Sequence, residues 1–526
     1  MKIFSHNIFK YIFVLVVVAL IAGAVYIIYY QNNKEYIPDE EDIVTDQSNQ
    51  NIAIVENMKM GISNYDTMNP LLTKNKEIVN LGRFIFEPLV NITSDYKVEN
   101  CLAKSVEQVS ETQYKVIIDT NIKWQDGSSL ISKDIEYTVG VLKSVDSIYS
   151  ENVQNIENVE LPDSETAIIN LKQPNKFFEY YLDFPLVSSS YYFNDDIVTS
   201  TKIPIGTGMY KIASNDDDNI FLIRNDRWRN IKNKTPKTQS ITIHKYKAIG
   251  ETFNTFKLGN IDVINTYMTN YADYVGTMGY NKKEYAGRDY NFISFNCADQ
   301  IMSDKAVRKA IAMAINKNNL VSTVFNNSKI VANSPLDYGS YLYKKDGEIT
   351  CNQDEAKKTL EEDGWVYTNN RWQKSIDGYV RKLNLNFIVN ADNAERLNVA
   401  NNIKEQLEQV GINVNLVKVG NDRYYQYINE KNYQMILTGI TNSIAPDISY
   451  FYGEGNLANY NNDDVKNNIY NTEKFEDIQK IINDDVPYVG IYRNKGFVIL
   501  NANVGGNFTP TSYFTYYNFN EWFRQQ

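Results

Sequence analysis

The sequence predicts an α/β fold preceded by one membrane-spanning helix. Three observations carry this prediction: a strand–helix–strand pattern late in the chain, an amphipathic helix in its middle, and a long uncharged apolar run near the N-terminus. A chain of 526 residues exceeds what one hydrophobic core usually supports, so we expect two or three domains. With 43% apolar and 22% charged residues, the composition is that of a folded protein.

The strand–helix–strand pattern begins at residue 383. Alternate residues of the segment 383–389 are apolar, as in a strand with one buried face. A helical stripe follows and ends at Gly411; its members are Ala400, Ile403, Leu407 and Val410. Alternation resumes over 412–416. Strand, helix and strand at this length predict a right-handed parallel crossover, and hence a sheet covered by helices.

The middle helix is predicted after Ser303. Its apolar positions recur every three or four residues and give one buried face: Val307, Ala310, Ile311, Ala314 and Ile315. Ser303 and Asp304 can start this helix through capping and the helix dipole. Arg308 lies off the apolar face, so we expect it at the surface or in an ion pair between domains. Earlier in the chain, the segment 114–124 is expected to be a strand that ends at a turn.

The apolar run covers residues 11–30, YIFVLVVVALIAGAVYIIYY. At about 1.5 Å per residue it spans the roughly 30 Å hydrocarbon layer. Lysines precede it and acidic residues follow, which makes residues 1–10 a cytoplasmic tail and places the rest outside the cell. Residues 31–51 are polar and acidic and are expected to be a linker.

A cleaved signal peptide is the alternative to this anchor. The tripeptide Ala-Gly-Ala at 22–24 resembles a signal-peptidase site that follows an apolar run. Cleavage there leaves a hydrophobic new N-terminus, because the apolar stretch continues to Tyr30. We therefore predict a single-pass cell-membrane protein whose C-terminal ectodomain lies outside the cell.

Charge and residue usage argue against several classes of function. A net charge of -11 makes nucleic acid a poor partner, because nucleic acid is bound by clustered Lys and Arg. Only His6 and His244 are present, which leaves almost no material for a nucleophile–histidine pair or a multi-histidine metal site. His244 lies in an alternating strand-like segment, where a structural imidazole is expected.

The three cysteines are far apart and form neither a disulfide framework nor a zinc motif: Cys101, Cys297 and Cys351. Phosphate-binding glycine motifs are absent as well. We predict no enzymatic activity, no metal and no cofactor.

Four segments of the chain, in a fixed order, are informative about its family. They are MGISNYDTMNPLLTKN with LGRFIFEPLV (60–75 and 81–90), IKWQDGSSLISKDIEYTV (122–139), IGTGMYKI (205–212) and NFISFNCADQIMSDKAVRKAIAMAINKNNLV (291–321). In this order and at these distances they resemble the bacterial extracellular solute-binding protein family 5, which includes the oligopeptide-, dipeptide- and nickel-binding receptors of ABC importers. The resemblance extends from about residue 58 to the end. Taken singly, the motifs have structural explanations: Trp124 belongs in a core, and Gly206 and Gly208 permit unusual backbone angles where the chain crosses between domains.

The resemblance implies a three-lobed fold of the type II periplasmic-binding-protein kind with a hinged cleft. Lobe I would comprise residues 52–90, 203–290 and 490–526, lobe II residues 91–202, and lobe III residues 291–489. It further implies a monomeric receptor that captures an oligopeptide or another small solute by cleft closure. The receptor would deliver its ligand to an ABC permease and the associated ATPase subunits. The alternative is a non-transporting ligand sensor or membrane-anchored scaffold of the same fold.

Two backbone strips are implied as the ligand site. In peptide-binding relatives, extended backbone from two lobes pairs with the ligand main chain. Carried onto this chain, the strips are Leu72, Thr73, Lys74 and Asn75 in lobe I, and Gly439, Ile440 and Thr441 in lobe III. The family often carries a G-W-x-x-D-x-x-D-P run at the second strip, whose first Asp pairs with the peptide amino terminus. This chain has GITNSIAPD instead, with Asn442 or Ser443 at that acid and Asp447 as the one carboxylate of the run. We therefore add Asn442 and Asp447 to the site candidates and expect weak recognition of a free amine.

Overall fold

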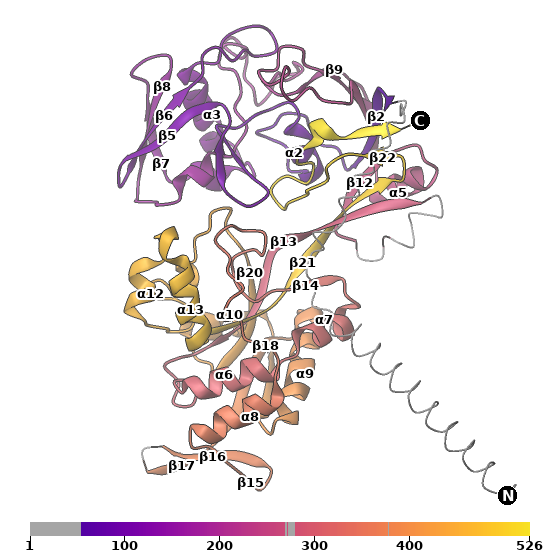
Figure 1. Ribbon diagram of the computed structural model, residues 1–526. Helices are drawn as coiled ribbons and strands as arrows, with labels where there is room; N and C mark the ends of the chain where they lie inside the picture. The colour runs from indigo at the N-terminus through magenta and orange to yellow at the C-terminus, as the bar shows by residue number, and fades with distance from the viewer. Residues whose placement is uncertain (1–53, 269–270, 272–278, 377, 526) are drawn as a thin grey trace, which may run out of the picture. The chain divides into compact units, whose positions relative to one another are not determined.

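The computed structural model describes residues 54–268, 271, 279–376 and 378–525 (Figure 1). The expected membrane segment, residues 11–30, lies outside the described residues, as do the cytoplasmic tail and the acidic linker. Within the described ranges no helix is both long and apolar enough to cross a bilayer. The membrane anchor therefore stays a prediction.

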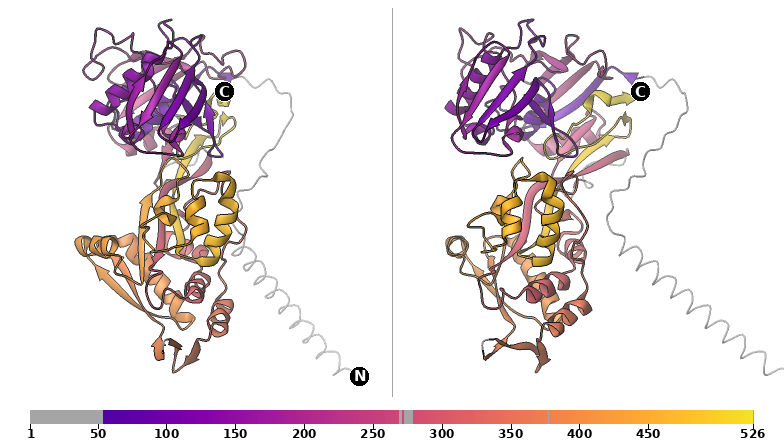
Figure 2. Two further views of the ribbon diagram at one scale, coloured as in Figure 1. Left: turned by 90° about the vertical axis from the view of Figure 1, so that its left-hand side faces the viewer. Right: turned by 60° about the vertical axis from the view of Figure 1, so that its left-hand side comes forward.

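One eleven-stranded sheet gathers segments from most of the chain. Its strands neighbour one another in the order β19 (Asn413–Val419), β18 (Asn384–Asn390), β20 (Met435–Thr441), β13 (Tyr280–Phe295), β21 (Tyr488–Asn501), β12 (Val263–Thr266), β2 (Asn57–Ser63), β11 (Ser240–Tyr246), β10 (Asn219–Arg224) and β9 (Tyr210–Asn215), with β14 (Lys329–Val331) beside β21. β13 and β21 are the longest strands and run antiparallel along each other (Figures 1 and 2). This pair therefore joins the strands of the N-terminal segments to the helix-rich segment between residues 300 and 485.

The predicted strand–helix–strand unit is confirmed. β18 and β19 pair in parallel, and α9 (Ala394–Gln409) forms the crossover between them. The helical stripe that the sequence indicated is buried and belongs to the same hydrophobic cluster as Leu385 and Phe387. Burying a Leu, Ile or Phe side chain contributes about 1.5–3 kcal/mol. The alternation of apolar residues therefore fixes which face of β18 meets the helices.

The helix predicted after Ser303 is α6 (Lys305–Ala314), with Asp304 as its N-cap. The expectation for Arg308, however, is wrong. Its side chain is 5% exposed and donates to main-chain carbonyls just before α6 and at the end of α13: Met302 (2.6 Å), Ser303 (3.1 Å), Asp485 (2.6 and 2.9 Å) and Val486 (3.2 Å). The last carbonyls of a helix have no intrahelical partner, so a buried guanidinium can satisfy them. Arg308 thus ties the start of α6 to the end of α13 (Phe475–Asp485).

A separate antiparallel sheet occupies the segment 91–202. Its strands lie in the order β5 (Ala103–Ser110), β6 (Gln113–Ile118), β8 (Thr166–Leu171) and β7 (Ile156–Glu160), and α3 (Ser132–Ser144) packs on β7 and β8. Trp124 is buried as predicted, and its indole N–H donates to Asp134 Oδ2 at 3.1 Å. The expected strand is shorter than predicted, because β6 ends at Ile118 and the chain then turns through a hydrogen bond from Ile122 N to the Asp119 carbonyl.

Gly206 and Gly208 serve close packing, and the explanation through unusual backbone angles is wrong. Neither glycine has a positive φ. A Cβ on Gly206 would lie 1.8 Å from the Ile85 carbonyl oxygen, and one on Gly208 would lie 2.5 Å from the Phe84 carbonyl oxygen. Backbone atoms leave no room for a side chain at either position.

The remaining elements are short. They are α2 (Lys76–Gly82), α4 (Ser150–Val153), η1 (Phe178–Leu182), α5 (Ile249–Lys257), α7 (Lys317–Phe325), α8 (Gln353–Glu362), α10 (Asn421–Glu430), α11 (Ser449–Tyr452), α12 (Asp463–Asn468), η3 (Thr472–Lys474), η4 (Phe519–Glu521), and the small sheets β3–β4 (Val90–Ile92, Val98–Asn100), β15–β16–β17 (Val366–Thr368, Arg371–Ile376, Tyr379–Lys382) and β1–β23–β22 (Ile54–Val55, Phe523–Gln525, Val504–Gly505). The three cysteines are free thiols. His244 lies in β11 and its Nδ1 is 2.7 Å from Asn219 Oδ1, as expected of a structural imidazole.

Candidate ligand-binding site

The first predicted strip, Leu72–Asn75, forms a turn that leads into α2. Its four backbone N–H groups donate within the same loop: Leu72 and Thr73 to the Asn69 carbonyl (3.2 and 3.1 Å), Lys74 to Asp66 Oδ2 (2.7 Å), and Asn75 to Thr73 Oγ1 (3.2 Å). In this conformation the strip can offer a ligand its carbonyl oxygens but not its N–H groups. Its binding role stays a prediction.

Asn75 holds this turn in place. Its side-chain oxygen accepts from Glu77 N (2.9 Å) and Ile78 N (3.4 Å) and so caps α2. Its amide nitrogen donates to the carbonyls of Ser63 (2.7 Å) and Asn64 (3.0 Å) at the end of β2. Asn75 therefore joins the strip to the large sheet.

Glu77 gives this region a pH dependence. Its Oε2 accepts from Ser63 N at 3.0 Å, and burial raises the pKa of the carboxyl to about 7. Below the unfolded-state pKa of about 4.5, both states hold the proton and the stabilising contribution is complete. As the pH rises through 7, the folded state must ionise a buried group and loses that contribution.

We therefore expect Glu77→Gln to flatten the stability profile between pH 5 and pH 8. The wild type should lose about 2 kcal/mol of unfolding free energy across that range, and the variant should lose much less. Urea unfolding of the full chain at both pH values measures the difference. Glu107→Gln, which changes an exposed carboxylate, is the matched control and should keep the wild-type slope. An equal slope in Glu77→Gln would show that another group titrates.

The second predicted strip ends β20, one of whose edges is open. β13 pairs with β20 along its whole length, from Phe295 opposite Met435 to Asp289 opposite Thr441. On the other edge, β18 reaches only the first two residues of β20. Among the described strands none pairs with that edge of Gly439–Thr441. An unpaired strand edge is a template for adding another extended chain.

Arg396 lies over one face of β20, at Gly439. It belongs to the first turn of α9, and its Nε donates to Asn291 Oδ1 at 3.0 Å. A Cβ on Gly439 would lie 2.5 Å from Arg396 Nη2 and 2.6 Å from Asn291 Oδ1. Glycine is therefore required at position 439 for the guanidinium and the amide to lie over the strand. A positive charge therefore lies over the face of β20 at Gly439.

The chain after β20 is held by a second arginine. Arg288 Nε and Nη2 donate to the Asn442 carbonyl at 2.9 and 2.5 Å, and the guanidinium lies 5.8 Å from the centre of the Tyr513 ring. The Asn442 amide nitrogen donates to the Pro335 carbonyl at 2.6 Å. Asn442 is therefore anchored in the scaffold on both sides. Asp447, two residues before α11, accepts from Ser449 N at 2.8 Å.

Tyrosines frame the same segment. The Tyr181 hydroxyl lies 3.0 Å from Ser443 Oγ, and the Tyr513 hydroxyl donates to the Ile444 carbonyl at 3.2 Å. The Tyr513 ring meets Tyr96 edge to face at 5.1 Å. Tyrosine combines apolar area with a polar tip, a property that suits recognition surfaces. These contacts bring residues of the segment 91–202 to the chain that follows β20.

Sequence reasoning missed Arg288, Arg396 and the tyrosines. The 40 tyrosines of the chain gave no way to single out three. Arg396 did leave a signal. A basic residue in the first turn opposes the helix dipole, so its presence there calls for another reason. It also follows a parallel strand directly, and ligands of α/β sheets bind near the carboxyl ends of strands.

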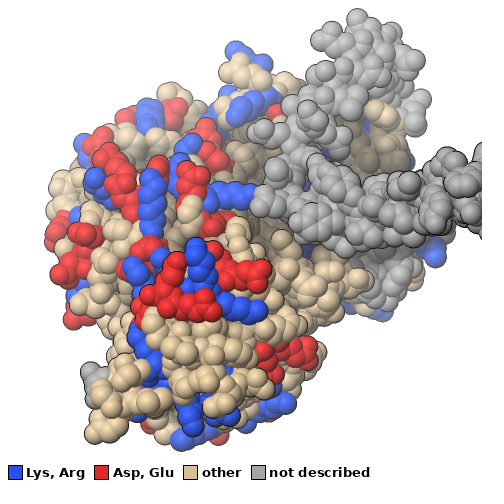
Figure 3. All heavy atoms as spheres, turned by 60° about the horizontal axis from the view of Figure 1, so that its bottom comes forward, with Lys and Arg blue, Asp and Glu red and all other residues tan. Residues whose placement is uncertain are grey.

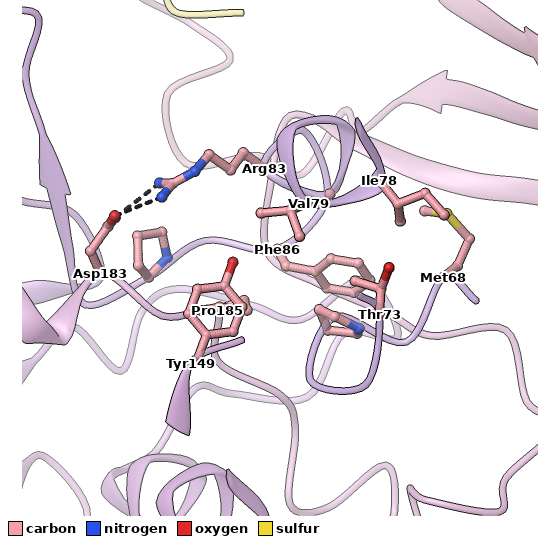
Figure 4. A pocket seen from close by; sticks show the side chains of 12 residues that line it. Met68, Thr73, Ile78, Val79, Arg83, Phe86, Tyr149, Asp183 and Pro185 are labelled. Atoms are coloured by element: carbon pink, nitrogen blue, oxygen red, sulfur yellow. Dashed lines mark hydrogen bonds and ion pairs between the residues drawn. The ribbon is translucent and has the colours of Figure 1, made fainter. Parts of the chain in front are cut away.

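A small hollow lies where α2 meets Tyr149, Asp183 and Pro185 (Figure 4). Its volume of about 10 Å³ has room for about one water molecule. Arg83 and Asp183 point toward each other across it and form two bonds, of 2.9 and 2.6 Å. Burial raises the pKa of the Asp183 carboxyl, and the Arg83 guanidinium opposes part of that rise. The hollow is too small to hold a peptide, and the ion pair across it links α2 to the segment that contains Asp183.

The described residues contain no group of three or more His, Cys, Asp or Glu side chains arranged to hold a metal ion. On the face shown in Figure 3, basic and acidic side chains are interspersed rather than gathered by sign.

Comparison with known proteins gives consistent matches. The family model described as bacterial extracellular solute-binding proteins, family 5 Middle, matches residues 97–463, well over half of the chain. The oligopeptide-binding protein AppA of Bacillus subtilis is 22% identical over 474 residues, which cover 83% of this chain and 86% of AppA.

Solved structures share the fold. The unliganded open form of the periplasmic murein tripeptide binding protein MppA has a TM-score of 0.75 at 16% identity and covers 90% of this chain and 98% of its own. A nickel ABC transporter structure from Bacillus halodurans has a TM-score of 0.71 at 18% identity, with coverages of 88% and 99%. At these identities the structures show the fold alone, a mixed α/β arrangement of the binding-protein type.

Proposed function

Since the chain belongs to the bacterial extracellular solute-binding proteins of family 5, we propose that it captures peptides outside the cell and delivers them to the permease of an ABC importer. The open edge of Gly439–Thr441 is the observation that carries the proposal of a peptide ligand. An extended peptide can add to that edge as a further strand through main-chain hydrogen bonds. Each such bond contributes about 0.5–1.5 kcal/mol net.

The groups around the open edge support a peptide over a compact solute. Main-chain pairing accepts any sequence, and Arg396 adds a charged donor for a ligand carboxylate or carbonyl. AppA of Bacillus subtilis is an oligopeptide-binding protein, which supports the same ligand class. The nickel transporter from Bacillus halodurans makes a metal complex the competing ligand class.

The role of Arg396 can be tested by substitution. We expect Arg396→Gln to weaken the binding of a peptide ligand about tenfold, because a hydrogen bond to a charged group contributes about 1.5–3 kcal/mol. Titration calorimetry of the full chain measures this change. The matched control is Arg423→Gln, which removes an exposed arginine of α10 and should leave binding unchanged. Equal affinities in wild type and Arg396→Gln would argue against a ligand at this edge.

We further propose that residues 11–30 anchor the receptor in the cell membrane with its ectodomain outside. The uncharged run and its basic N-terminal flank support this topology. On intact cells, added protease should therefore digest the ectodomain, and a high-salt wash should leave the protein in the membrane fraction. Recovery of a soluble form that begins at Val25 would instead establish signal-peptide cleavage.

A further inference from the structure

A second cavity lies between the start of α7, the loop 333–349 and α13. Its volume is about 50 Å³, room for about four water molecules. The first residues of β21 form part of its wall: Tyr488, Val489 and Gly490. Most of the lining belongs to the segment that the resemblance assigns to lobe III, and Tyr290 and Gly490 come from the adjoining ends of the lobe I ranges.

One end of the cavity carries two opposite charges. Lys317 Nζ donates to Asn333 Oδ1 at 2.6 Å, and Asn333 Nδ2 donates to Glu348 Oε2 at 2.8 Å. A single amide therefore holds an ammonium and a carboxylate on the same wall. Lys317 is also the first residue of α7, where the helix dipole favours a negative charge. Burial lowers the pKa of Lys317 to about 8, so most of the ammonium stays charged at neutral pH.

Tyr343 adds a hydroxyl group that has no hydrogen-bond partner in the described part of the chain. The side chain lines the cavity, and its hydroxyl is buried. Its ring is held edge to face against Tyr338 at 4.7 Å. A buried hydroxyl without a partner costs about 1–3 kcal/mol. An acceptor inside the cavity would remove that cost.

Aliphatic side chains also line the cavity: Ala312, Leu336, Ile349, Ile448, Ile482 and Val486. A ligand that fits must therefore combine an apolar body with a polar end that offers an acceptor and tolerates both signs of charge.

We propose that this cavity is a second ligand site, which takes a small aliphatic amino acid. The ligand carboxylate would accept from Lys317 Nζ and the Tyr343 hydroxyl, its ammonium would lie beside Glu348, and its side chain would fill the aliphatic end. A ligand between alanine and valine in size displaces about as much as the four waters the cavity could hold. This assignment does not depend on the peptide proposal.

Calorimetry of the full chain with L-valine tests this proposal. We expect wild type to bind with a Kd below about 1 mM. Lys317→Met should weaken binding about tenfold or more. Tyr343→Phe should weaken it about fivefold without lowering the melting temperature of the ligand-free protein, because the hydroxyl has no bond to lose. Lys418→Met, which changes an exposed lysine of β19, is the control and should bind as wild type does.

Three results would overturn the proposal. One is the absence of any heat with L-valine, which would leave water as the occupant. Another is equal binding in wild type, Lys317→Met and Tyr343→Phe, which would place valine elsewhere. The third is displacement of valine by a saturating peptide, which would place valine at the β20 edge.

Discussion

Gly206→Ala is expected to unfold the protein or to force the chain apart at the crossing beside Ile85. The new Cβ would lie 1.8 Å from the Ile85 carbonyl oxygen and 2.6 Å from its carbonyl carbon. Both are backbone atoms and cannot rotate away. The segment is fixed on its other side as well, because Gly206 and Gln125 exchange two hydrogen bonds of 3.1 Å, one from each backbone N–H. We expect a loss of more than about 4 kcal/mol of unfolding free energy.

The matched control for this effect is Gly140→Ala. Gly140 lies inside α3, and a Cβ there would meet nothing within 4 Å. Alanine in a helix interior is favoured over glycine by about 1 kcal/mol, so this variant should be slightly more stable than wild type. Urea unfolding of the full-length variants measures both changes. A Gly206→Ala protein within 1 kcal/mol of wild type would refute the close approach to Ile85.

Asp183→Asn is expected to lower the unfolding free energy by about 3–5 kcal/mol. The two bonds between Arg83 and Asp183 join the end of α2 to the segment after η1, and the Asp183 side chain is 2% exposed. Removing one partner of a buried pair leaves the other charge without compensation. The pair lines the small hollow of Figure 4, where about one water molecule could replace the lost contact.

A double variant separates the cost of the lone charge from the worth of the pair. Replacing both residues, as Arg83→Met with Asp183→Leu, should destabilise less than Asp183→Asn alone, because no buried charge is left unpaired. Glu476→Gln, at an exposed pair with Lys480, should change stability by less than about 1 kcal/mol. Chemical unfolding of the three proteins decides this. A double variant as unstable as the single one would mean that packing, and not charge, governs the joint.

The parts of the fold that the sequence predicted are those that local pattern determines. Alternation over 383–389 and the stripe of α9 identify a parallel unit, because period 2 and period 3.6 bury different faces. The prediction that Trp124 lies in a core is also confirmed, because its large apolar side chain is buried.

The failures share a physical cause. Arg308 was expected at the surface or in an ion pair between domains because it lies off the apolar face of its helix, yet it bonds to carbonyls of a helix end about 177 residues later in the chain. Gly206 was assigned a backbone role, although the constraint comes from Ile85 across the fold. For Leu72–Asn75, which the resemblance implied as a ligand strip, the structure adds that the N–H groups donate within the loop, and its binding role stays a prediction. Contacts between distant segments leave no local pattern.

The candidate site divides in the same way. The second strip, Gly439–Thr441, lies on an open strand edge as a strip that binds main chain would require. The charged groups near it could not be predicted from the sequence, because Arg288 and Arg396 belong to different elements and reach β20 only in the folded chain. The peptide-binding role of both strips is a proposal that rests on this geometry.

The measurement that tests the central claim most directly is native mass spectrometry of the full chain after incubation with a diverse pool of peptides. Our account predicts mass additions that match single peptides of several residues and of varied sequence, because main-chain pairing at Gly439–Thr441 is indifferent to side chains. Retention of a nickel complex in place of peptides, or no addition from any peptide in the pool, would contradict it.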